Sequence, residues 1–182
     1  KRVIPTMGNN ASMSAGIVFA HFKYNFQSAL KKTMYCEDKA KEYLDRNAYY
    51  ISILKHSGSE VQFGLKWISG IEKQRTIEII NNIINMAVTN KLSMKFFGSA
   101  YEMLEKIGSD KDLFASLLKK EIKDHLGKDK KIKKDEKTKL MIDMINYFDT
   151  LQSTIIKTED KNKIILSLLL GLRFLSSKGG SD

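Results

Sequence analysis

The chain has 182 residues, 42% of them hydrophobic and one of them proline, a composition typical of a globular, helix-rich protein rather than a disordered one. A single cysteine, Cys36, excludes a disulfide framework and any multi-thiolate metal site, and indicates the reducing cytoplasm. The net charge of +10 predicts attraction to nucleic acid, although the Lys-rich composition of an AT-rich genome explains it equally well. The most apolar run, residues 164–170, is far shorter than the roughly 18 residues of a membrane span, so we expect a soluble protein with no membrane partner.

Residues 1–12 contain Pro5, Gly8 and two Asn without any period, which predicts a loop or tail. The chain begins with Lys1-Arg2 rather than Met, so we expect it to be a piece of a longer protein.

The sequence then predicts a strand, a helix and a β-hairpin. Residues 13–20 form a short apolar run rich in Ile, Val and Phe, which is typical of a buried strand. Residues 26–44 mix apolar with charged residues and predict an amphipathic helix. Its apolar positions are Phe26, Leu30, Tyr35 and Leu44. Apolar residues alternate over 49–53 and again over 61–67, with a Ser-Gly turn between them, which predicts the hairpin.

Residues 70–178 predict an all-α bundle of about five helices, because apolar residues recur at helical spacing through every segment. Ser93, Asp110 and Thr158 are expected at helix starts, and Gly127 at a helix end. Residues 179–182 are expected to be a flexible tail. The fold class is therefore α+β, with an α/β unit over residues 13–69 and the helical bundle after it.

Three short motifs in this order resemble the closing half of a GGDEF-like nucleotide-cyclase palm. They are SAG at 14–16, AK at 40–41 and RNA at 46–48. The words AHFKY after the strand and LKHSG after the helix are similar to one branch of that family, the large palm-containing subunit of type III-B (Cmr-type) CRISPR effector complexes. NKLSMKFFGSAYEMLEKI and ILSLLLGLRFLSS resemble the helical C-terminal domain of the same subunit.

The resemblance implies that residues 13–69 are the C-terminal half of a partial ferredoxin-like palm. Three strands and one helix cannot cover both faces of a sheet, so the N-terminal part of the same subunit or another chain is expected to complete it. Further partners implied by the resemblance are the small helical subunit of the complex, the CRISPR RNA and the target RNA.

The complete palm of that family converts ATP into cyclic oligoadenylate or a related messenger when target RNA binds. It holds two divalent ions, Mg or Mn, on a Gly-Gly-Asp-Asp hairpin. This chain has no such hairpin, and its only Gly-Gly pair, Gly179-Gly180, lies in the predicted tail. We therefore expect no catalytic residue, no metal ligand and no activity in this piece alone, with ATP and the metal belonging to the complete palm.

The resemblance assigns Lys41, Arg46 and Asn47 to the nucleotide phosphates. An ammonium beside a bidentate guanidinium suits a polyphosphate. The chain departs from the family pattern by one extra residue between the two cations, with Asp45 where a glycine is expected. The alternative is a solvated Lys41 and an Arg46 paired with Asp45 or Glu42.

Ser14, Gly16 and His21 are candidates for positions next to the nucleotide. Gly16 is also expected to permit close approach of a neighbouring element, and Ser14 to bond nearby backbone. His21 is alternatively a hydrogen-bonded structural residue at a strand end. Because His21, His56 and His125 lack metal-ligand spacing, we expect no zinc site.

Residues 119–139 contain ten Lys against five Asp or Glu, which makes this segment a candidate RNA contact. The residues proposed for that contact are Lys128, Lys130, Lys131, Lys133 and Lys134. No aromatic residue lies among them for base stacking, so a solvated loop between helices is the alternative.

Two other functions remain open. The first is a non-catalytic RNA- or protein-binding module, in which the palm is degenerate and the basic bundle binds the partner. The second is a relative of signalling diguanylate cyclases, which the five-helix bundle and the words AHFKY and LKHSG disfavour.

Overall fold

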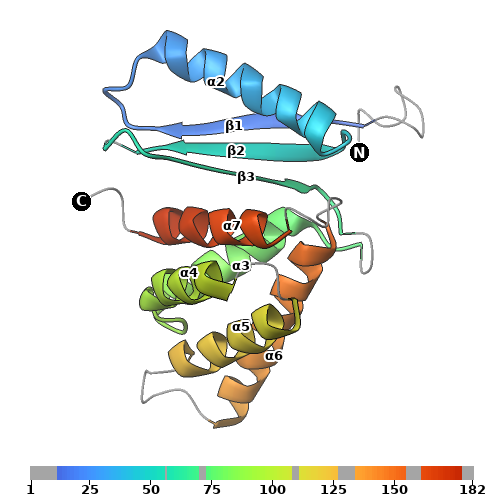
Figure 1. Ribbon diagram of the computed structural model, residues 1–182, viewed down its shortest axis with the longest axis vertical. Helices are drawn as coiled ribbons and strands as arrows, with labels where there is room; N and C mark the ends of the chain where they lie inside the picture. The colour runs from blue at the N-terminus through green and yellow to red at the C-terminus, as the bar shows by residue number, and fades with distance from the viewer. Residues whose placement is uncertain are drawn as a thin grey trace. The chain divides into compact units, whose positions relative to one another are not determined.

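The computed structural model describes residues 12–55, 57–69, 73–107, 111–126, 134–154 and 161–177. The chain forms two compact units, Lys1–Trp67 and Ile68–Asp182. The first unit contains β1 (Ala15–Ala20), α2 (Phe26–Asp38), a π-helical turn η1 (Lys39–Tyr43), β2 (Ala48–Leu54) and β3 (Glu60–Lys66) (Figure 1). The second contains α3 (Thr76–Val88), α4 (Lys95–Ile107), α5 (Lys111–His125), α6 (Lys134–Ser153) and α7 (Lys161–Ser176). The α+β prediction, with a strand-helix-hairpin unit followed by a helical bundle, is confirmed.

The three strands form one mixed sheet in the order β1-β2-β3. Strand β1 runs parallel to β2, with Ala15 beside Tyr49, and β3 runs antiparallel to β2, with Lys66 beside Ala48. The predicted hairpin is therefore present. In its turn Gly58 has φ +82° and donates its N–H to Lys55 O at 3.0 Å, a conformation that glycine adopts without strain.

Helix α2 packs across β1 and β2 on one face of the sheet (Figure 1). Gly16 permits the contact, because a Cβ at this position would collide with Thr33 O and lie 2.5 Å from Glu37 N. The close approach expected at Gly16 is confirmed. Small side chains line the buried side of the helix and of η1, where Cys36 and Ala40 are fully buried.

The apolar positions predicted for this helix are mostly on its exposed side. Of the four, only Leu44 is buried, whereas Phe26, Leu30 and Tyr35 are 41–77% exposed. The sequence pattern is misleading here because the sheet selects small residues, which let backbone approach backbone, rather than large ones. Burial raises the pKa of the Cys36 thiol to about 11, so Cys36 is an unreactive core residue.

A polar network crosses the face between α2 and the hairpin. Lys32 Nζ lies 2.7 Å from Glu60 Oε1, and Ser52 Oγ donates to the same oxygen. Partial burial alone would raise the pKa of Glu60, but hydrogen bonds from Lys32, Ser52 and Gln62 outweigh it and hold that pKa below the ordinary value. The network fixes α2 against β2 and β3 through charged groups, in addition to the small-residue contact.

The second unit has its core among five helices in the part of the chain that the structure describes. Helix α4 packs against α5 and α7, α3 packs against α6 and α7, and α5 packs against α6. Ser93 Oγ accepts from Lys95 N at 3.3 Å, as expected for a residue at a helix start. Aromatic rings of Phe96, Phe97 and Phe148 form the centre, with centroids 5.4 and 6.1 Å from Phe96. Asp110 and Thr158, expected at helix starts, and Gly127, expected at a helix end, lie outside the described residues. So do residues 1–11 and 179–182.

Candidate phosphate-binding site

The connection from α2 to β2 departs from α-helical geometry before it reaches the strand. Leu44 N–H donates to Lys39 O at 3.2 Å and Arg46 N–H to Lys41 O at 3.1 Å, both with the five-residue spacing of a π-turn. Single π-turns of this kind are rare and occur often at functional sites. The turn lies where the sequence analysis assigns phosphate binding.

Three consecutive non-glycine residues then adopt left-handed backbone conformations. Their φ values are 52° at Asp45, 55° at Arg46 and 45° at Asn47. Asp and Asn tolerate this region, whereas each other L-residue pays roughly 1–2 kcal/mol for it. The glycine expected at position 45 from the family pattern would fit the backbone found there. We call residues 45–47 the left-handed turn.

The end of the hairpin holds this turn in place. Lys66 Nζ donates to Asp45 O at 2.7 Å and to Arg46 O at 2.8 Å. Trp67 N–H donates to Asn47 O at 3.2 Å. Lys66 was not identified from the sequence. The only feature that could have indicated its role is the hairpin register, which pairs Lys66 with Ala48, the residue after the left-handed turn. Lys66 is a positioning residue for the backbone of Arg46.

Lys41 has an ion-pair partner in the helix. Its Nζ lies 2.7 Å from Glu37 Oε1, and both side chains are more than 40% exposed. Lys41 is thus an exposed helix-face residue, so the alternative of a solvated Lys41 stays open. An exposed pair at this helical spacing contributes only about 0.3–0.5 kcal/mol, so a phosphate could displace Glu37 at little cost.

Arg46 and Asn47 are exposed on the surface of the turn. The backbone N–H of Arg46 donates to the carbonyl of Lys41 at 3.1 Å, so the backbones of the two candidate residues are in contact despite the extra residue between them. The described contacts of Arg46 are those of its backbone, and an ion pair with Asp45 or Glu42 is not among them.

The other three candidates are divided between the two ends of β1. Ala15 pairs with Tyr49, so Ser14 and Gly16 lie at the end of the sheet where the left-handed turn enters β2. Trp67 Nε1 donates to Met13 O at 2.9 Å and joins the start of β1 to the same end. His21 follows Ala20 at the opposite end, roughly 20 Å away at the rise of an extended strand.

His21 therefore cannot reach a phosphate group bound by Lys41 or Arg46. Its Nδ1 accepts from Lys23 N–H at 3.3 Å, and its carbonyl accepts from Tyr24 N–H at 2.8 Å. The structure thus favours the hydrogen-bonded structural role that was the alternative for His21.

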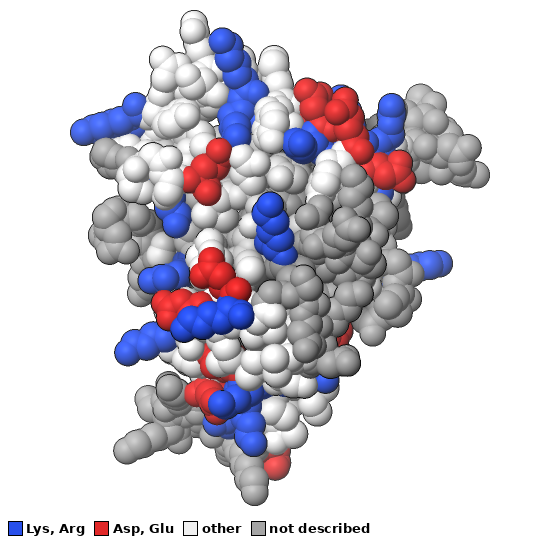
Figure 2. Space-filling view, in the orientation of Figure 1, with Lys and Arg blue, Asp and Glu red and all other residues white. Residues whose placement is uncertain are grey.

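The candidate RNA-contact residues fall almost entirely outside the described part of the chain. Lys128, Lys130, Lys131 and Lys133 lie in the undescribed residues 127–133, and Lys134 is described only as the first backbone position of α6. Among the described residues on the face in Figure 2, Lys and Arg are interspersed with Asp and Glu and form no continuous basic area.

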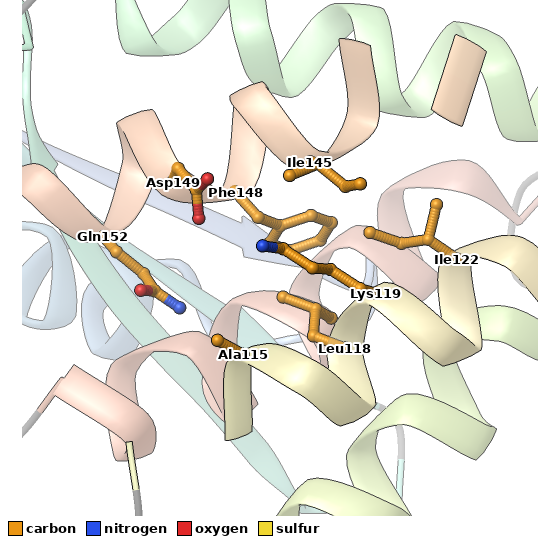
Figure 3. Close-up of a pocket in the computed structure, with 8 residues that line it drawn as sticks. All are labelled: Ala115, Leu118, Lys119, Ile122, Ile145, Phe148, Asp149 and Gln152. Carbon is orange, nitrogen blue, oxygen red and sulfur yellow. The ribbon is translucent and has the colours of Figure 1, made fainter. Parts of the chain in front are cut away.

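Within the described ranges, neither a metal cluster nor the hollow between α5 and α6 offers an alternative site. No group of three His, Cys, Asp or Glu side chains there is placed to hold a metal ion together. A hollow between α5 and α6 is lined mainly by apolar groups such as Leu118, Ile122 and Phe148, with Lys119 and Asp149 also on its wall (Figure 3). It has room for about one water molecule, far below the several hundred Å³ of a small-molecule site.

No model of a protein family matches the chain, and no curated protein matches it either. Among the described helices, none combines the length and the apolar character needed to cross a membrane.

Proposed function

We propose that the chain is the C-terminal part of a large palm-containing CRISPR subunit of the Cmr type and supplies one wall of its ATP site. In this role Lys41, Arg46 and Asn47 bind the nucleotide phosphates. The missing half of the palm supplies the metal-binding carboxylates, and ATP and Mg or Mn bind between the two halves. The helical unit docks against the small subunit and the RNA.

The observation that carries this proposal is the left-handed turn. A non-glycine residue held at φ +55° costs conformational energy, and such strain is retained mostly where a function requires it. Here it places the exposed Arg46 just before β2, with its backbone bonded to that of Lys41, whose own side chain is held by only a weak ion pair. The fold around the turn, a parallel strand pair with a helix crossing one face, agrees with a partial palm.

The chemistry assigned to these residues is binding and charge stabilisation. A triphosphate carries its charge on oxygens that accept bidentate bonds from a guanidinium and point-charge contacts from an ammonium. The residues hold and orient the phosphates, and the metal ions of the complete site would activate the attacking hydroxyl.

The test is messenger synthesis by the full-length protein assembled with its partners and target RNA. The double variant Lys41→Ala and Arg46→Ala is expected to assemble normally and to convert ATP into product at a reduced rate. Arg75→Ala is the matched control, because Arg75 is also exposed and its guanidinium lies 3.6 Å from Glu78. Product formation by the double variant at the wild-type rate would remove the phosphate-binding assignment.

A further inference from the structure

The turn between β1 and α2 exposes a group of aromatic side chains. Its sequence, HFKYNF at residues 21–26, leaves Phe22 85%, Phe26 77% and Tyr24 42% exposed. Burying one such ring stabilises a protein by about 1.5–3 kcal/mol, so three exposed rings within five residues are unusual on a monomer surface. We call residues 21–26 the aromatic turn.

The aromatic turn is an ordered structure. His21 accepts two hydrogen bonds, from Lys23 N–H at its Nδ1 and from Tyr24 N–H at its carbonyl, and these close the turn. Asn25 Oδ1 accepts from Ser28 N–H at 3.0 Å and caps α2. The His21 and Phe22 rings lie 4.4 Å apart with a tilt of 38°. The exposed rings are therefore presented on a fixed backbone, which lowers the entropy lost when a ligand binds them.

The surroundings of the aromatic turn favour an anionic ligand. Residues 12–36 contain no Asp or Glu, whereas Lys23 and Lys31 are exposed there. Lys23 Nζ lies 5.7 Å from the centroid of the Phe22 ring, so a cation and a stacking face occur together. A ligand that has a flat ring and a negative charge would contact both the Phe22 ring and the Lys23 ammonium.

We propose that the aromatic turn binds single-stranded nucleic acid, with Phe22 stacking on an unpaired base and Lys23 contacting the adjacent phosphate. Bases offer a π-face that an exposed ring can cover, and the nucleic-acid backbone charge complements the exposed Lys23 and Lys31, since Glu60 at this end of the sheet is already paired with Lys32. A purely apolar protein surface would make no use of the lysines, whereas each phosphate of a nucleic acid would. This site lies at the opposite end of β1 from the left-handed turn and does not depend on the function proposed above.

Fluorescence anisotropy with a labelled oligouridylate of about twelve nucleotides, at low salt, tests the proposal on the whole chain. Loss of one stacking contact predicts that Phe22→Ala weakens binding about 5- to 150-fold. Phe22→Leu keeps the apolar area but lacks the π-face, so it should weaken binding similarly, whereas Phe22→Trp should retain affinity. Lys23→Ala should reduce the slope of log affinity against log salt by about one. Val88→Ala, on exposed helix surface of the second unit, should change nothing.

Phe22 is too exposed for its removal to unfold the chain, and circular dichroism of each variant checks this directly. Equal affinity of wild type and Phe22→Ala, equal affinity for an oligomer of the same length without bases, or no binding at low salt would each overturn the proposal. Concentration-dependent self-association that Phe22→Ala abolishes, with oligonucleotide affinity unchanged, would identify a protein interface instead and overturn it as well.

Discussion

Arg46 combines an exposed guanidinium with a backbone conformation that arginine adopts at a cost. The neighbouring Asp45 and Asn47 belong to the residue types that tolerate positive φ, so the strain of the left-handed turn is concentrated at its central residue. Two carbonyl hydrogen bonds from Lys66 hold the backbone there. A glycine at position 46 would satisfy the backbone, so the presence of arginine indicates a use for its side chain.

Two substitutions of Arg46 separate the strain of its backbone from the role of its side chain. Arg46→Ala and Arg46→Gly both remove the guanidinium, but only glycine adopts φ +55° without steric penalty. We expect the glycine variant to be more stable than the alanine variant by about 1 kcal/mol. Urea unfolding of the two variants measures the difference. Identical midpoints and slopes would show that the left-handed conformation is not strained.

Residue types were readable from the sequence, but their geometry was not. Lys41, Arg46 and Asn47 stood out through the resemblance, and the departure at Asp45 was visible as an unexpected residue. The π-turn could not be predicted from local sequence. Its geometry depends on the strand pairing that follows, because the chain leaving η1 has to bring Ala48 opposite Lys66. Lys66 was missed for the same reason, since its contacts with residues 45 and 46 span about twenty positions of sequence.

At the scale of elements, the contact between α2 and the sheet is set by small residues. The first strand was predicted from a short apolar run, and the hairpin from apolar alternation, which the pleat of a sheet imposes directly. The extent of the helix was predicted correctly, but the residues on its buried side were not. Large residues such as Phe26 and Leu30 dominate the sequence pattern, whereas Gly16, Cys36 and Ala40 form the contact.

Gly16→Ala tests this contact. The added Cβ would meet the backbone of α2 at Thr33 and Glu37, which cannot give way as a flexible side chain does. Overpacking of this kind typically costs about 1–3 kcal/mol, and we expect a loss in that range in chemical unfolding.

Gly98→Ala is a matched control with the opposite expected sign. Its Cβ would meet only the mobile end of Arg173 at 3.2 Å, and alanine favours the interior of α4 by up to about 1 kcal/mol. If Gly16→Ala proved as stable as wild type while Gly98→Ala was destabilised, the close approach of α2 to β1 would be contradicted.

At the scale of the whole molecule, the two proposed binding sites lie at opposite ends of β1. The left-handed turn carries the exposed Arg46 near the start of the strand, and the aromatic turn carries exposed rings and Lys23 at its end. The net charge of +10 supports anion binding at both, but long-range charge alone does not distinguish one site from another. Substitutions at each site distinguish the two.

The proposed function depends most on the binding of phosphate by Lys41 and Arg46. Calorimetric titration of the chain with tripolyphosphate measures it without requiring the rest of the palm. Charge-assisted hydrogen bonds contribute about 1.5–3 kcal/mol each, so Arg46→Gly should weaken binding about 10- to 150-fold. Lys41→Ala should weaken it comparably, and Arg75→Ala should leave it unchanged. Equal affinity of wild type and Arg46→Gly, or an equal loss in Arg75→Ala, would contradict the phosphate site.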